Sequence, residues 1–162
     1  MRFFTTTLLT LLFAASTFTI GAHAQEIIQS EVDEFSGNMV VQSSFEEIEH
    51  EGFPGSADVS VLYVEGDYGI VLTVTSRDSW QLLGADQVQF IIDDDREAFD
   101  LLRMETETSG GTTQEEYLIL LSLSDLSALA SADDVRFRAD RNVYTVTPNA
   151  QEAMELVINE VE

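Results

Sequence analysis

The sequence predicts an α+β fold, in which a mostly antiparallel β-sheet built from hairpins carries a short helix and a C-terminal helix packed on one face. Three observations predict this fold. Apolar and polar residues alternate in several short segments, as is typical of half-buried strands. Turn-forming residues separate these segments at short intervals, so neighbouring strands are expected to pair as hairpins. After residue 123, two segments show apolar residues at the period of amphipathic helices.

The segment from Gln87 to Arg103 contains the clearest of these hairpins. Apolar and polar residues alternate in 87–92, which predicts a strand. The acidic run 93–96 follows, and because burial of unpaired carboxylates is strongly unfavourable, we expect this run to form an exposed turn. Residues 97–103 are then expected to form the returning strand.

The first 24 residues have the pattern of an export signal. Arg2 precedes the apolar run 8–20, and Ala22-His23-Ala24 supplies the small residues of a cleavage site. No second apolar run of spanning length follows. We therefore expect cleavage after Ala24, one α+β domain over residues 25–162 without a membrane span, and a periplasmic or secreted location. The alternative is a retained N-terminal anchor.

The expected mature chain is strongly acidic. It contains 30 Asp and Glu against 6 Arg and no Lys, a net charge of −24. Nucleic-acid binding requires a basic surface, which this composition excludes. Adaptation to a salty medium explains both the excess of acids and the missing Lys, because high ionic strength screens self-repulsion. The absence of Cys excludes thiol catalysis and cysteine-based metal sites.

The first part of the expected domain alternates between polar segments and strands. Residues 25–34 are polar and are expected to be frayed, and 35–38 to turn the chain into a first strand over 39–45. Residues 46–56 contain two Gly and a Pro, which predicts a loop or a short irregular segment. Residues 58–64 and 69–76 alternate well and predict a hairpin with a Gly-containing turn.

The middle of the chain contains the most apolar segment of the expected domain. Residues 105–114 are polar and predict a mobile loop with Gly110 and Gly111 at its tip. Residues 117–123 then form a continuous apolar run, which predicts a central strand covered on both faces. Ile119 and Leu121 are expected to be among the most buried side chains.

Two helices and a further hairpin complete the prediction. Ser124 is expected to cap a helix over 125–132, and Thr147-Pro148-Asn149 to begin the last helix. The hairpin between them, 135–146, contains Arg136, Arg138 and Arg141. These arginines suit either an anion site or neutralisation of nearby carboxylates, and the acidic composition favours the second.

The acidic turn is the candidate metal site, with Asp93, Asp94 and Asp95 as its candidate ligands. The EF-hand pattern fails there, because Ala98 stands where Gly is needed and Met104 where Glu is needed. A cation bound loosely by three carboxylates remains an alternative to a solvated turn, which charge runs usually form. His50, with Glu49 and Glu51 beside it, is interpreted as a solvent-exposed loop residue, because one His cannot form a His-rich site.

Two parts of the chain carry a resemblance. The segment Val32-Asp33-Glu34-Phe35-Ser36-Gly37 before a first strand resembles the opening of small exported bacterial α+β domains of unassigned function. The segments 126–132 and 135–138 resemble the same group, in which a short helix precedes a strand pair and a terminal helix. The resemblance implies this fold, and it implies no catalytic residues.

The function predicted from these observations is a non-catalytic exported envelope protein, a binding or accessory module for an envelope protein or small ligand. No catalytic motif such as GxSxG or HExxH occurs, and no motif of a nucleotide or other cofactor. The alternatives are a carboxylate-based hydrolase and a calcium-binding structural protein. Thirty acids make close carboxylate pairs inevitable, so a hydrolase requires two carboxylates in a deep cleft.

Overall fold

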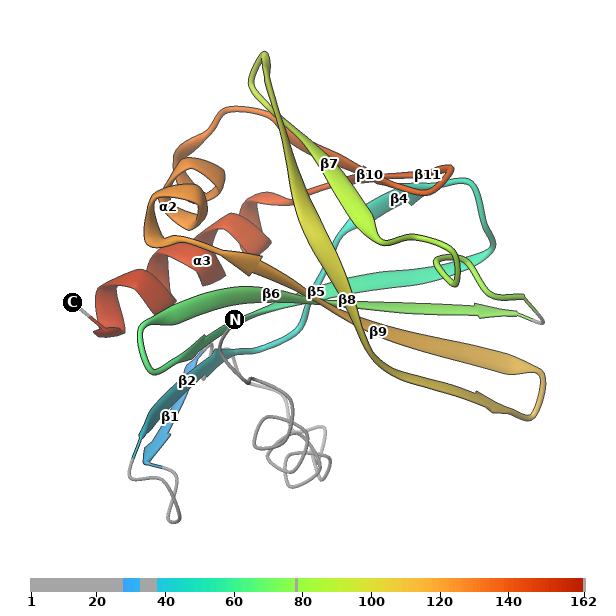
Figure 1. The fold of residues 1–162 in the computed structure, drawn as a ribbon, viewed down its shortest axis with the longest axis horizontal. Coiled ribbons are helices and arrows are strands. Elements are labelled where there is room, and N and C mark those ends of the chain that lie inside the picture. The colour runs from blue at the N-terminus through green and yellow to red at the C-terminus, as the bar shows by residue number, and fades with distance from the viewer. Residues whose placement is uncertain (1–27, 33–37, 78, 162) are drawn as a thin grey trace.

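The computed structural model describes residues 28–32, 38–77 and 79–161. The described chain is mostly antiparallel β-sheet, curled into a half-barrel, with two helices (Figure 1). The strands are β1 (Ile28–Val32), β2 (Met39–Ser43), β3 (Glu46–Glu47), β4 (Glu49–Glu51), β5 (Gly55–Val64), β6 (Asp67–Arg77), β7 (Gln87–Ile92), β8 (Asp95–Ser109), β9 (Thr112–Leu121), β10 (Val135–Ala139) and β11 (Asn142–Thr145). The helices are α2 (Leu123–Ser131) and α3 (Pro148–Val161).

The strand order is β1-β2-β5-β6-β9-β8-β7-β10-β11-β4, with β3 pairing to β5 away from this path. β9 is therefore a central strand, as the apolar run predicts. β3 and β4 are nearly consecutive in the chain, yet β3 pairs with β5 and β4 pairs with β11. The segment 46–51 thus joins two distant parts of the sheet. It brings the edge at β4 and β11 toward β5, so the sheet curls into a half-barrel.

Strand β8 produces much of the curl. Its first residues pair with β7 up to Asp100, and from Leu101 onward it pairs with β9. A register shift between Arg103 and Glu105 marks a bulge, which bends a strand and increases its twist. Figure 1 shows β8 crossing over from the part of the sheet with β9 to the part with β7.

The prediction of a mobile loop over residues 105–114 is wrong. These residues continue β8 to Ser109 and begin β9 at Thr112, so only Gly110 and Gly111 remain as a two-residue turn. Both glycines have positive φ, 59° and 82°, as the hairpin turn of this length requires. The Glu65–Gly66 turn between β5 and β6 has the same form, with φ of 57° and 95°, and confirms the hairpin predicted there.

The core lies on the inner side of the sheet. Ile119 and Leu121 are 0% and 7% exposed, which confirms their predicted burial. Leu120 is 41% exposed on the opposite side, so the prediction that both faces of this strand are covered is wrong at Leu120. Helix α2 contributes Leu126 and Leu129 to this core. Helix α3 contributes Ala150, Ala153, Met154 and Val157, all of them buried, as its helical apolar period predicts.

Helix α2 begins two residues earlier than predicted. Its N-cap is Ser122, whose hydroxyl accepts a hydrogen bond from Asp125 N, while Asp125 Oδ2 accepts one from Ser122 N at 2.9 Å. This reciprocal capping box satisfies two backbone donors at the helix start. Ser124, the predicted cap, lies inside the first turn.

Two segments near the N-terminus differ from the predicted pattern. Within 25–34 the structure has strand β1, and within the predicted loop 46–56 it has β3 and β4. The predicted turn at 35–38 falls largely on residues outside the described ranges, as does the expected export signal. No helix in the described ranges is long and apolar enough to cross a membrane.

Candidate functional site

The outer face of the half-barrel carries a surface that the core does not explain. In β5, β6, β8 and β9 alternate side chains point inward to the core, and the others point outward. Residues directly opposite each other on neighbouring antiparallel strands share one face of the sheet. The pairing register therefore shows which outward side chains lie in one line across the strands.

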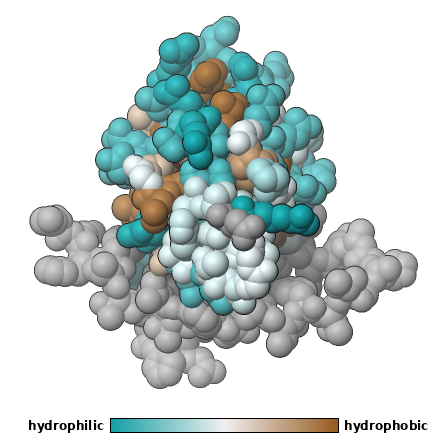
Figure 2. Space-filling model, turned by 90° about the vertical axis from the view of Figure 1, so that its right-hand side faces the viewer, coloured by the Kyte–Doolittle hydropathy of each residue, from teal (hydrophilic) through white to brown (hydrophobic). Residues whose placement is uncertain are grey.

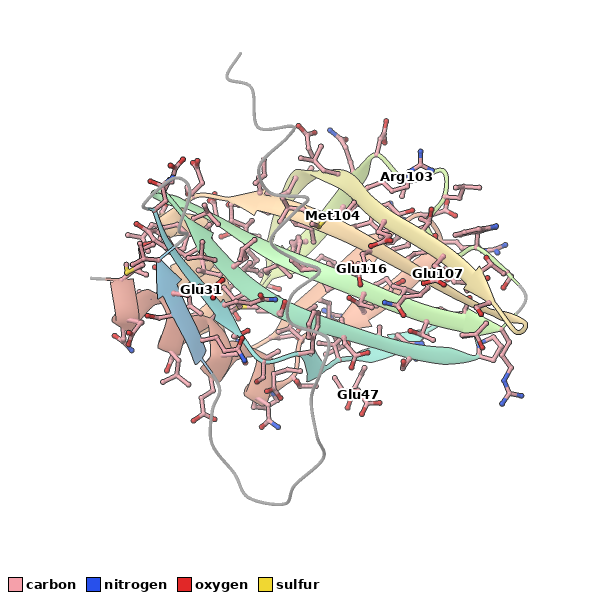
Figure 3. The ribbon with its side chains drawn as sticks, turned by 90° about the horizontal axis from the view of Figure 1, so that it is seen from below. Glu31, Glu47, Arg103, Met104, Glu107 and Glu116 are labelled. Carbon is pink, nitrogen blue, oxygen red and sulfur yellow. The ribbon has the colours of Figure 1, made fainter. Side chains whose placement is uncertain are left out.

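One such line consists almost entirely of carboxylates, and we call it the acidic row. Glu47 pairs with Asp58, Asp58 with Thr73, Thr73 with Glu116, and Glu116 with Glu105. Five strands, β3, β5, β6, β9 and β8, thus place four carboxylates and one threonine side by side. Figure 3 views this face, with Glu47 and Glu116 labelled.

The acidic row is electrostatically unfavourable in the protein by itself. Like charges directly opposite each other on paired strands destabilise a sheet, and both Glu47–Asp58 and Glu116–Glu105 are such pairs. Within the described ranges, no arginine forms an ion pair with these carboxylates. Burial, followed by the charge of Glu47, raises the pKa of Asp58, although a hydrogen bond with Ser56 opposes the increase.

Thr73 occupies the middle of the acidic row. Its side chain is 8% exposed, and its hydroxyl is buried without a hydrogen-bond partner. An unpaired buried hydroxyl costs free energy of about 1–3 kcal/mol. Glu116, on the next strand, accepts a hydrogen bond of 2.9 Å from Gln114 Nε2. The acidic row therefore contains carboxylates that repel one another and, between two of them, a hydroxyl without a hydrogen-bond partner.

An apolar patch lies beside the acidic row on the same face. It is formed by Val40, Leu62, Val71 and Leu118, which are themselves buried at 0–8% exposure, with Val64 and Met104 packed against them. Gly69 belongs to this face, because a Cβ there would lie 2.7 Å from Leu118 Cδ1. The glycine lets Leu118 lie flat over β6, and the patch continues to the exposed Leu102 and Leu120. Met104 is labelled in Figure 3.

The candidate metal ligands Asp93, Asp94 and Asp95 are not arranged around one point. Asp93 has φ 55°, and its Oδ1 accepts hydrogen bonds from Asp133 N and Asp134 N at 3.0 and 3.1 Å. It thus ties the β7–β8 turn to the segment after α2, while Asp95 begins β8. No group of three or more carboxylates or imidazoles in the described ranges is placed to hold a metal ion.

His50 lies on β4 and not in a loop. Its Nε2 is 3.0 Å from the carbonyl oxygen of Gly55, and its ring stacks on Phe53 with centroids 4.2 Å apart. The ring therefore packs against the adjoining turn. A shallow groove of about 950 Å³ runs beside it, and it is lined by Glu46, Glu47, Ile48, Glu49, His50, Glu51, Arg136, Val143, Thr145, Thr147, Pro148 and Asn149.

Arg136 pairs with a neighbouring carboxylate, whereas Arg138 bonds a neutral side chain. Arg136 Nε lies 2.9 Å from Asp134 Oδ2, an ion pair with both side chains about half exposed. Arg138 donates a hydrogen bond of 2.7 Å to Gln89 Oε1 on the neighbouring strand β7. Neither contact points to a bound anion.

Glu115 is a buried carboxylate that the sequence analysis did not single out. It is 0% exposed, and it accepts hydrogen bonds from the backbone N–H groups of Gln81 and Leu82 at 2.5 and 3.0 Å, and from Tyr117 Oη at 3.3 Å. Its position, two residues before the inward Tyr117, is the signal that could have revealed it. The carboxylate anchors the β6–β7 connection to β9.

The end of the molecule near the β8–β9 turn has a different character from the outer face. Figure 2 shows pale side chains of intermediate hydropathy there, with hydrophilic side chains above and beside them and hydrophobic ones in small separate groups. No protein-family model, curated protein or solved structure matches this chain. The candidate site therefore rests on the geometry of the acidic row and the apolar patch.

Proposed function

We propose that the protein is a non-catalytic exported binding module that engages a protein partner through the outer face of its sheet. The observation that carries this proposal is the acidic row: four carboxylates in register on four strands, without arginine partners among the residues that the structure describes, and beside an apolar patch. The export pattern of residues 1–24 and the resemblance to small exported bacterial α+β domains support the same proposal.

The chemistry of this face defines the partner. Charge complementarity selects a positively charged surface, and the exposed Leu102 and Leu120 at the edge of the apolar patch select partner side chains that lose water on contact. We infer further that α2 and α3 both lie on the inner side of the sheet, as the sequence predicts. Their buried side chains share one core with the inward residues of β6 and β9, which supports this placement. The outer face then remains available for a partner.

The arrangement of the carboxylates supports a binding module over a hydrolase. A carboxylate-based hydrolase needs two carboxylates that converge on one bond within a cleft. In the acidic row the carboxylates are spread along a line across the sheet. Glu115 is the buried carboxylate of the described core, and its oxygens already accept backbone and tyrosine hydrogen bonds.

A capture experiment with matched variants tests this function. The intact protein is immobilised and exposed to the envelope fraction of its source cells, beside the double variants Glu105→Gln/Glu116→Gln and Glu152→Gln/Glu155→Gln. Both variants remove two negative charges, but the second changes exposed residues of α3. We expect one partner to be retained by the wild-type protein and the α3 variant and lost by the outer-face variant. Equal retention by all three proteins would contradict the proposal.

A further inference from the structure

The second half of strand β8 contributes little to the core. None of the residues 102–109 is buried, and most of them are polar. Local sequence signals favour a loop there, yet the segment pairs with β9 as far as Ser109. Core packing therefore does not explain why this segment is a strand.

One backbone edge of this segment has no partner strand. β7 pairs with β8 only as far as Asp100, and a hydrogen bond of 2.9 Å from Leu101 N to Asp86 O continues that contact by one residue. Beyond Leu101, β8 pairs with β9 alone among the described strands. Figure 1 and Figure 3 show this half of β8 at the border of the sheet, with Glu107 labelled in Figure 3. The sheet thus has a free edge along residues 102–109.

The register identifies the backbone groups that lie on this edge. Residues that flank a two-residue hairpin turn form a hydrogen-bonded pair, and such pairs alternate along antiparallel strands. Ser109 and Thr112 flank the turn between β8 and β9, so they form such a pair. The backbone N–H and C=O groups of Thr106 and Thr108 therefore point away from β9. They face the free edge, where no other described strand binds them.

We propose that a strand of the protein partner pairs with this edge in the antiparallel direction and extends the sheet beyond β8. Extended peptides bind exposed sheet edges in this way, because backbone hydrogen bonds provide affinity and alternate side chains provide specificity. This inference rests on the proposed binding function and names the element that the partner contributes. The partner strand has basic side chains at alternate positions.

The side chains along the edge define this composition. Glu105 and Glu107 are exposed on the outer face of the sheet, whereas Thr106 and Thr108 belong to the opposite face. In a pair of strands, opposite charges facing each other stabilise the sheet and like charges destabilise it. Lysine or arginine therefore fits the positions next to the glutamates. Threonine or valine, which favour strands, fits the positions next to the threonines.

A second copy of the chain fits this edge poorly. An antiparallel pair of copies centred on Thr106 would place Glu105 of each copy opposite Glu107 of the other. The net charge of −24 over residues 25–162 adds repulsion between copies. Charged side chains on edge strands are a common protection against self-association. Here they oppose an acidic strand and favour a basic one.

Amide hydrogen exchange of the intact protein, followed by NMR, tests the edge directly. Thr106 and Thr108 are expected to exchange rapidly although they lie within a strand, whereas pairing with β9 protects Glu105 and Glu107. The peptide acetyl-Lys-Thr-Lys-Val-Lys-Thr-Lys-amide is then expected to slow exchange at both threonines. Protection of the threonines without peptide, or unchanged exchange with it, would overturn the inference.

Two backbone-methylated peptides show whether the binding is strand pairing. Methylation of the Thr and Val nitrogens removes the donors that face β8 in an antiparallel pair, whereas methylation of an equal number of Lys nitrogens removes donors that face solvent. We expect the first peptide to bind at least about tenfold more weakly, the effect of a lost hydrogen bond. The second is expected to bind like the unmodified peptide. Equal binding by the two methylated peptides would contradict strand pairing.

A charge reversal tests the composition of the partner strand. Glu105→Lys/Glu107→Lys is expected to prefer acetyl-Glu-Thr-Glu-Val-Glu-Thr-Glu-amide over the lysine peptide, the reverse of the wild-type preference. Glu152→Lys/Glu155→Lys changes exposed residues of α3 by the same charge, and it is expected to keep the wild-type preference. Thermal melts show that both variants are folded. The same preference in all three proteins would rule out recognition of a basic strand.

Thr106→Pro blocks the edge without changing its charge. Proline removes an N–H that no described strand binds, and edge strands tolerate such a proline. The variant is expected to stay folded in thermal melts and to lose binding of the lysine peptide. Sedimentation of the wild-type protein is expected to show a monomer. A dimer that Thr106→Pro dissociates would overturn the inference, because a second copy would then occupy the edge.

The same variant separates this inference from the proposed function. In the capture experiment, Thr106→Pro is expected to lose the partner that the wild-type protein retains. If it retains the partner while the outer-face variant Glu105→Gln/Glu116→Gln loses it, the edge inference is wrong and the binding function stands. If the lysine peptide binds the edge but no envelope protein is captured, the binding function is wrong.

Discussion

Adjacent residues on β9 have opposite roles because successive side chains of a strand point to opposite faces. Glu115 points inward and accepts three hydrogen bonds, whereas Glu116 points outward into the acidic row. A glutamate therefore stabilises the fold at position 115, whereas a glutamate at position 116 destabilises it. Substitution of Glu115 or of Glu116 by Gln therefore compares how a buried and an outward-facing carboxylate affect stability.

Glu115→Gln is expected to lower the free energy of unfolding by about 2–3 kcal/mol. An amide in place of the carboxylate presents N–H donors to the N–H groups of Gln81 and Leu82, and hydrogen bonds to a charged group contribute about 1.5–3 kcal/mol each. Glu116→Gln is the control and is expected to leave stability unchanged or slightly higher, because it removes a like-charge pair. Urea unfolding measures both, and equal losses would contradict this assignment.

Stability is expected to fall as the pH rises above about 10. Burial and the nearby Glu115 raise the pKa of Tyr117 to about 12, and burial also raises the pKa of Tyr144. Between the ordinary tyrosine pKa of about 10 and these higher values, the unfolded chain loses protons that the folded protein retains, so unfolding is favoured. Urea unfolding from pH 8 to 11.5 measures the slope. The double variant Tyr117→Phe/Tyr144→Phe is expected to flatten it, and an unchanged slope would contradict the prediction.

Strands and helices that bury an apolar stripe were predictable, because burial leaves a periodic pattern in the sequence. β5, β6, β7, β10, β11 and α3 follow that pattern. The second half of β8 and the start of β9 do not, because Thr, Glu and Gln alternate there with little difference in polarity. Pairing with β6 and the Gly110–Gly111 turn hold these polar residues in strands. Short-range signals therefore suggested a loop where contacts distant in sequence decide the structure.

The start of α2 was misplaced by two residues because two serines offer similar caps. The structure selects Ser122, since only from that position does Asp125 reach back to the N-cap backbone. The first helical residue, Leu123, was assigned to the preceding strand because it continues the apolar run. Strand β9 thus ends at Leu121, Ser122 caps the helix, and α2 begins at Leu123.

Ser122→Ala is expected to destabilise the protein by about 1 kcal/mol, because it removes the side-chain acceptor for Asp125 N. Ser124→Ala is the matched control at the position that the sequence favoured, and it is expected to have little effect. Chemical unfolding followed by far-ultraviolet circular dichroism measures both variants. A larger loss for Ser124→Ala would show that the helix begins as the sequence predicts.

The candidate site could not be predicted from the sequence, although each of its residues was visible there. Glu47 was assigned to a loop, Asp58 and Thr73 to a hairpin, and Glu105 to another loop. The acidic row appears only when the strand order places β3, β5, β6, β9 and β8 side by side. Strand order depends on contacts between distant segments, and local patterns carry no information about it.

For the molecule as a whole, the net charge of −24 over residues 25–162 predicts that salt stabilises the fold. Folding brings the carboxylates closer together, and the Debye length falls from about 10 Å at 0.1 M to about 3 Å at 1 M salt. The melting temperature is therefore expected to rise over this range, equally in sodium and potassium chloride. Calcium at low millimolar concentration is expected to add little. A melting temperature independent of monovalent salt would contradict this prediction, and a sharp rise with calcium alone would favour a calcium site.

The pairing of β4 with β11 has a consequence for how the chain acquires its structure. Glu49 to Glu51 pair with residues 143–145, so more than half of the chain separates the partners. Such distant contacts fold slowly, because the entropy of closing a long loop is lost before the contact forms. The sheet cannot be completed until β11 is available. The hairpins of consecutive strands can form as the chain emerges from its N-terminus, whereas the half-barrel cannot be joined through β4 until β11 has emerged as well.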